Sequence, residues 1–120
     1  MALNNGNQIA IEGTDGQATL DSSFIRIIAF NGLDNNPNET TIDVQFAFYS
    51  DKNKWIEDWR KNIIKVEGID KYRLNVKYSR IDDGIDILAF IYTKLIGYLM
   101  TLFHDWDVSK LVPELQNPNE

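Results

Sequence analysis

Few residues of this chain have the types and spacing that catalysis requires. Its single histidine, His104, would have to anchor any Ser/His/Asp triad, and a lone histidine near a helix end more commonly interacts with the helix dipole. The carboxylates of Asp82, Asp83 and Asp86 cluster, but capping of a helix start explains them better than acid-base catalysis. Cysteine is absent, which excludes disulfides, thiolate nucleophiles and zinc-thiolate sites. We therefore assign no catalytic residue and expect a protein that is not an enzyme.

One loop carries oxygen ligands at the alternate positions that a calcium site uses, namely Asp34, Asn36 and Asn38. Glu39 stands where the EF-hand requires glycine, and no glutamate follows at the required distance. Walker A and dinucleotide fingerprints are also absent. The sequence therefore predicts neither a metal site nor a cofactor.

Charge is distributed unevenly along the chain, whose formal net charge is -6. Residues 1–50 contain six acids and one base, residues 51–80 five acids and nine bases, and residues 81–120 seven acids and two bases. The central segment is thus basic between two acidic ones. Such a division indicates either an anionic partner for the central segment or charge matching between copies of the protein.

Nucleic-acid binding is the alternative function that this basic segment suggests. Lys71, Arg73 and Lys77 fall on one face of an expected strand and form a candidate anion contact, while Trp55 and Trp59 could stack on bases. The aromatic residues of that strand alternate onto its opposite face, which favours a core role for them and a solvated role for the lysines. A single-strand-binding module built on residues 52–80 is thus the second hypothesis.

Alternation of apolar and polar residues predicts an antiparallel β-sheet of four to five strands. The expected strands cover residues 8–12, 23–30, 41–49 and 71–79. Residues 8–12 could instead form an extended arm. In the strand at 41–49 we expect one buried and one wetter face, because its large apolar residues fall at every second position.

The segment between the last two of these strands reads as a short helix around residues 52–62. Trp55, Trp59 and Ile63 fall at every fourth position, and Ser50 or Asp51 can cap the start. Residues 63–67 could also form a strand, in which case the helix would be only two turns long.

The apolar stretch that ends at Trp106 predicts a long helix from near Gly84 to near His104, with Asp83 as its N-cap. A length of this order could span a membrane. Lys94 near the midpoint and acidic flanks at both ends disfavour that interpretation. We therefore expect no membrane partner, and a helix that packs across the sheet in an α+β fold.

Small side chains recur every four residues along this helix, a pattern that lets another backbone approach closely. The approaching backbone belongs either to a neighbouring element of the same domain or to another chain. A helix that is apolar nearly all round needs cover on nearly all sides, and one face of a small sheet covers only part of it. This argument favours another chain. The expected interface residues are Ala89, Thr93, Gly97, Thr101, Trp55 and Trp59.

One domain accommodates a chain of 120 residues. We expect a flexible or interface arm at residues 1–8, a single α+β domain at residues 9–111 and a polar tail at residues 112–120. The start of the chain has neither the basic nor the apolar stretch of a secretory signal, so we expect a cytoplasmic origin.

A resemblance to a known class of proteins arises from the order of these segments. SSFIRIIAFNG and TTIDVQFAFYSDKNKW precede an alternating strand and a final helix with the run IYTKLIGYLMTLFHDWDV. This arrangement resembles small structural proteins of bacteriophage tails, baseplates or necks, in which a β-rich body ends in a helix with a Tyr-x-x-Leu-like repeat and an acidic-aromatic finish. The matching features are Tyr92-Thr93-Lys94-Leu95 and Phe103-His104-Asp105-Trp106-Asp107. No proline-containing finish directly follows Leu102, which departs from that pattern.

The resemblance implies a non-enzymatic virion component that works by assembly and has no catalytic residues. Its implied partners are other copies of itself and neighbouring virion proteins. Its implied location is the virion, after synthesis in the bacterial cytoplasm.

Overall fold

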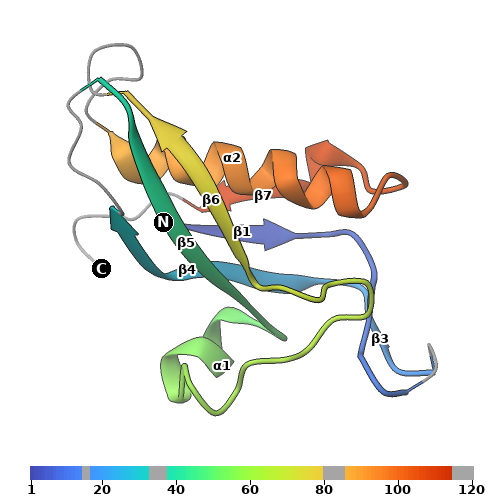
Figure 1. Cartoon of the computed structure of the whole chain (residues 1–120). Coiled ribbons are helices and arrows are strands. Elements are labelled where there is room, and N and C mark those ends of the chain that lie inside the picture. The colour runs from blue at the N-terminus through green and yellow to red at the C-terminus, as the bar shows by residue number, and fades with distance from the viewer. Residues whose placement is uncertain (15–16, 33–37, 80–85, 115–120) are drawn as a thin grey trace.

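The computed structural model describes residues 1–14, 17–32, 38–79 and 86–114, and their fold is α+β, as predicted (Figure 1). Five antiparallel strands form the main sheet in the order β6-β5-β4-β1-β7. Their bounds are Ala2–Asn5 for β1, Ser23–Gly32 for β4, Thr40–Tyr49 for β5, Arg73–Tyr78 for β6 and Leu111–Glu114 for β7. A separate small sheet pairs β2 (Ile9–Ala10) with β3 (Thr19–Leu20), and a 3-10 turn (Val108–Lys110) precedes β7. Helix α2 (Ile87–Leu102) covers one face of the main sheet, and the short helix α1 (Lys52–Glu57) packs on the other.

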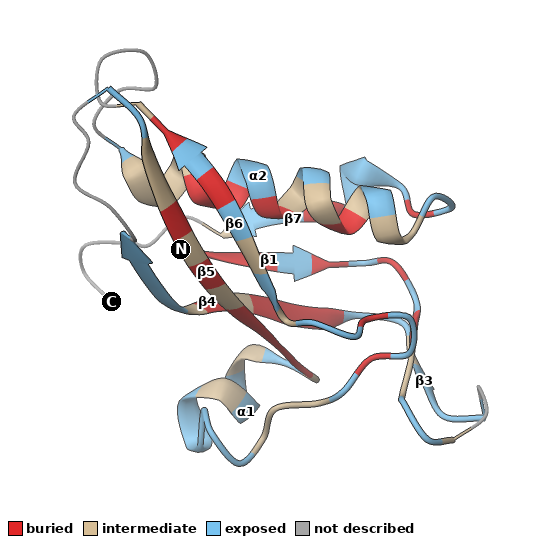
Figure 2. Ribbon diagram, in the orientation of Figure 1, coloured by how far each residue is buried: buried red, intermediate tan, exposed pale blue. Residues whose placement is uncertain are grey.

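The main core lies between α2 and the sheet (Figure 2). Alternate residues of β5 point to α2, and the prediction of a buried face on residues 41–49 is confirmed by Val44, Phe46 and Phe48, none more than 1% exposed. The other face of β5 differs from the prediction of a wetter side. Ala47 and Tyr49 are equally buried, because α1 packs over that end of the strand.

The first strand corrects the expectation of an arm at residues 1–8. Ala2–Asn5 forms β1, which lies inside the sheet with β4 on one side and β7 on the other. Leu3 is fully buried and pairs with Ile25 of β4 and Pro113 of β7. Two apolar residues followed by two asparagines give no recognisable alternation, and the strand exists because both neighbours supply its hydrogen bonds.

The last strand corrects the expectation of a polar tail from residue 112. Leu111–Glu114 forms β7 at the edge of the sheet, with Leu111 only 3% exposed. Pro113 suited the prediction of an irregular tail, but an edge strand tolerates proline because one of its two sides needs no hydrogen bonds. The domain therefore includes residues that we had assigned to both ends. Residues 115–120 lie outside the described part of the chain.

Helix α2 is present as predicted but is shorter, with 16 residues. Asp86 is its N-cap and accepts a hydrogen bond from the backbone N–H of Ala89 at 3.1 Å, whereas the predicted cap and start fall outside the described residues. The helix ends at Leu102, before His104. The chain turns there because the rings of Phe103 and Trp106 stack at a centroid distance of 4.3 Å.

Helix α1 confirms the predicted short helix and its cap but ends well before residue 62. The carboxylate of Asp51 accepts a hydrogen bond from the N–H of Lys54 at 2.9 Å. Asp58 then accepts hydrogen bonds from the N–H groups of Arg60 and Lys61, which closes the helix in a turn. Residues 63–67 make only isolated bridges, Ile64 with Phe48 and Val66 with Ile11.

Candidate interaction surface

The two tryptophans that we assigned to an interface lie in different environments. Trp55 is half-buried against the sheet, where its ring lies 5.9 Å from that of Phe24 and the Arg26 guanidinium lies 3.8 Å from its centre. Trp55 therefore packs on the small core beneath α1, and its assignment to an interface stays a prediction. Its position on the helix turns it towards the sheet, and alternation alone could not decide which of the two tryptophans would do so.

Trp59 is exposed, as an interface residue should be. Its side chain is 43% exposed, and that of Ile56, three residues earlier, is 63% exposed. The guanidinium of Arg60 lies 4.8 Å from the centre of the Trp59 ring. The spacing of Trp55, Trp59 and Ile63 did not single out Ile56, because its exposure depends on how α1 packs on the sheet.

The segment that carries this exposed pair is held firmly on the sheet. The hydroxyl of Tyr49, buried under α1, donates a hydrogen bond of 2.6 Å to the carbonyl of Trp59. Asn62 donates a further bond of 2.9 Å to the carbonyl of Lys54, so the turn after the helix closes on its start. Ile56 and Trp59 are thus presented to solvent by a fixed backbone.

The small stripe of α2 faces away from the sheet. Thr93, Gly97 and Thr101 are exposed and Ala89 is half-buried. A Cβ atom built on Gly97 would meet nothing within 4 Å, so no neighbouring element in the described residues packs on the stripe. The hydroxyls of Thr93 and Thr101 bond to carbonyls of their own helix, those of Ala89 and Tyr98. We considered that either an element of the same domain or another chain packs on the stripe. Within the described residues, no element of the same domain does so.

The apolar surface of α2 is smaller than we expected. Ile91, Tyr92, Leu95 and Leu99 are buried against the sheet, and the remaining large apolar residues of the helix are partly buried at its flanks. These residues are partly covered because they pack against the buried core, as where Phe90 packs edge-to-face on Tyr78 of β6 at 5.2 Å. The expectation that a single chain could not cover this helix is therefore wrong.

The predicted basic face of β6 is present but largely paired. Arg73 makes a two-point contact with Asp43 of β5, at 2.8 and 2.5 Å, and this contact holds the pKa of the Asp43 carboxyl below its ordinary value. Lys77 lies 3.3 Å from Glu39. Lys71 is exposed at the rim of a shallow hollow of about 430 Å³. Arg73 and Lys77 share one face of β6 and are both paired with carboxylates, whereas Lys71 lies before the strand begins.

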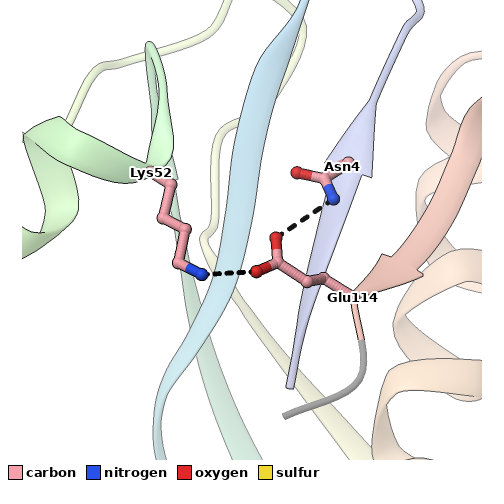
Figure 3. A network of polar contacts seen from close by, with 3 residues as sticks. All are labelled: Asn4, Lys52 and Glu114. Atoms are coloured by element: carbon pink, nitrogen blue, oxygen red, sulfur yellow. Dashed lines mark hydrogen bonds and ion pairs between the residues drawn. The ribbon is translucent and has the colours of Figure 1, made fainter. Parts of the chain in front are cut away.

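A second hollow, of about 390 Å³, lies where β1, β4 and β7 meet the start of α1. A three-residue network at its edge joins elements far apart in the sequence (Figure 3). The Lys52 ammonium lies 2.6 Å from Glu114, and Asn4 donates a hydrogen bond of 3.1 Å to the same carboxylate. These contacts hold the pKa of the Glu114 carboxyl below its ordinary value, with the hydrogen bond from Lys52 as the largest cause. No spacing rule predicts a pair whose partners are so distant.

The described ranges contain neither a candidate metal site nor a candidate membrane-spanning helix. No group of three or more His, Asp or Glu side chains there could hold a metal ion. No helix there has the length and apolar character of a membrane span. The loop whose spacing resembles a calcium site, and which the sequence already argued against, begins at Asp34. Asp34 lies outside the described residues.

Comparison with protein-family models, with curated proteins and with solved structures found no match to this chain.

Proposed function

We propose that this protein is a non-enzymatic assembly subunit that acts through protein–protein contacts. The observation that carries the proposal is the exposed pair formed by Ile56 of α1 and Trp59 in the turn that follows this helix. Large apolar side chains held in water by a fixed backbone are typical of contact surfaces, and tryptophan beside arginine is the composition of binding hot spots.

A bacteriophage particle is the assembly that we propose for it. The support is the resemblance of the β-rich body and its terminal helix to small tail, baseplate or neck proteins. In such a particle the partners would be other copies of the chain and neighbouring structural proteins.

The proposal predicts self-association of the purified protein. Light scattering at increasing concentration would measure the mean molar mass directly. A mass that rises above 13.8 kDa supports the proposal. A strict monomer at high micromolar concentration would contradict it.

Binding of single-stranded nucleic acid is less well supported. The guanidinium of Arg73 is engaged by Asp43, and the ring of Trp55 lies under Arg26, so neither is presented to a ligand. Binding of a labelled single strand at low and moderate salt tests this alternative, since contacts to phosphates weaken steeply as salt rises.

A further inference from the structure

Charged residues surround the exposed pair at the end of α1. The carboxylate of Glu57 lies 3.5 Å from the Lys54 ammonium, and that of Asp58 accepts hydrogen bonds from the two backbone N–H groups that follow Trp59. Arg60 and Lys61 follow Trp59 directly and are exposed, and neither makes an ion pair with any described residue. We call Ile56, Trp59, Arg60 and Lys61 the α1 patch. Its chemistry, an apolar centre with positive charge beside it, fits a partner surface that carries carboxylates.

The same chain carries such a surface where the end of α2 meets the segment before β6. The backbone of residues 65–67 pairs with that of residues 10–12, and the ring of Phe103 lies 3.1 Å from a Cβ built on Gly68. These contacts bring together four exposed carboxylates from three parts of the chain. They belong to Glu12, Glu67, Asp70 and Asp105, which we call the acidic end.

Two observations show the electrostatic character of the acidic end. None of its four carboxylates makes an ion pair within the described ranges, and Lys65, two residues before Glu67, lies over the ring of Tyr72 at 4.6 Å. Burial raises the pKa of the Tyr72 hydroxyl, and the charges of Glu12 and Asp70 raise it further. Glu12 and Asp70 therefore act on the same group.

The two surfaces lie at different places on the molecule. Helix α1 packs on one face of the sheet, while the end of α2 lies beyond the other face, to the right in Figure 1. A chain cannot bring its own α1 patch against its own acidic end without unfolding. A second copy can supply the missing half of the contact.

We propose that the α1 patch of one copy docks on the acidic end of a second copy. This inference rests on the proposed function and specifies its contact. Charge favours this pairing over the alternatives, because two α1 patches would set Arg60 and Lys61 against the same cations, and two acidic ends would repel likewise. Contact between unlike surfaces is head-to-tail, so repetition gives either a ring or an open chain rather than a closed two-fold dimer.

Sedimentation velocity of four proteins at low and moderate salt tests the docking. The first is the unaltered chain, and the second carries Arg60→Glu and Lys61→Glu. The third, which we call the β6 control, carries Lys77→Glu on β6 and Lys94→Glu on α2, an equal change of charge at exposed positions outside both surfaces. The fourth combines the α1 reversal with Glu12→Lys, Glu67→Lys and Asp70→Lys, which exchanges the signs of the two surfaces. Circular dichroism confirms that each variant folds, as substitutions at exposed positions should allow.

We expect the α1 reversal to weaken association at least tenfold, the β6 control to change it little, and the exchanged pair to recover most of it. Association of the unaltered chain should also fall as salt screens the charges. Trp59→Ser should weaken association by tenfold or more at either salt concentration, because hot-spot tryptophans contribute through apolar burial. If the unaltered chain associates but the α1 reversal behaves like the β6 control, the docking is wrong and the proposed function survives. If the unaltered chain is monomeric, both fail.

Discussion

At the scale of single residues, Tyr92 does the most to join α2 to the sheet. Its hydroxyl accepts a hydrogen bond of 2.9 Å from the N–H of Ile27 and donates one of 2.7 Å to the carbonyl of Met1. Ile27 lies where the pairing of β4 with β5 shifts register, so its N–H needs a partner from outside the sheet. One side chain thus satisfies a backbone group of β4 and a backbone group of the residue just before β1.

Replacing Tyr92 with phenylalanine should lower the free energy of unfolding by about 1–3 kcal/mol, because a buried N–H loses its acceptor. Urea denaturation measures the change. Tyr98→Phe is the matched control, since the hydroxyl of Tyr98 makes no hydrogen bond to the described residues. An equal loss in both variants would show that the hydroxyl of Tyr92 contributes nothing specific.

Titration of the Glu114 carboxyl should change the free energy of unfolding. Its pKa is lower in the folded protein than the ordinary 4.5, so its contact with Lys52 is fully present above pH 4.5 and is lost as the pH falls through the folded value. Glu114→Gln should therefore be less stable than the unaltered chain at pH 7, by roughly 1 kcal/mol or less for a partly exposed pair. The difference should shrink as the pH falls below 4.5 and disappear once the pH lies below the folded pKa. Urea denaturation at a series of decreasing pH values checks this, and a difference independent of pH would contradict it.

At the scale of elements, a substitution at Gly97 tests whether anything packs on the stripe of small residues along α2. Gly97 lies inside the helix with open space around it, so alanine there should raise the free energy of unfolding by about 0.5–1 kcal/mol through better helix propensity. Thermal unfolding measures the gain. A loss of stability would mean that something covers this position.

Gly97→Leu extends the test to assembly. The folded chain should accept leucine, because nothing lies within 4 Å of the added carbon. If the stripe receives another chain closely, the variant should fold normally and assemble poorly, and light scattering beside circular dichroism separates the two effects. Unchanged assembly would remove Ala89, Thr93, Gly97 and Thr101 from the interface.

At the scale of the whole molecule, the sequence predicted what depends on local pattern. The alternation on β5 and β6, the apolar run of α2 and the cap at Asp51 all come from neighbours a few residues apart, and each is present. The sequence could not reveal β1 or β7, because each is short and is stabilised by a partner more than a hundred residues away. For a related reason the sequence could not show that Trp55 packs on the small core, since burial there depends on where α1 lies on the sheet.

The extent of the domain can be tested by deletion. Removing residues 112–120 takes away most of β7 and the Glu114 contact, and should destabilise the protein by on the order of 1–3 kcal/mol. Removing residues 115–120 alone is the control that isolates the strand. If both deletions unfold at the same urea concentration, residues 112–114 add nothing to the sheet.

The place of β1 between β4 and β7 also has a consequence for biosynthesis. β1 is made before every other described element, yet the strand that covers its outer side is made after all of them. During translation that side keeps unpaired backbone groups open to other nascent chains. The sheet can close only after β7 has been made, so a chaperone that shields β1 until then would raise the yield of native protein.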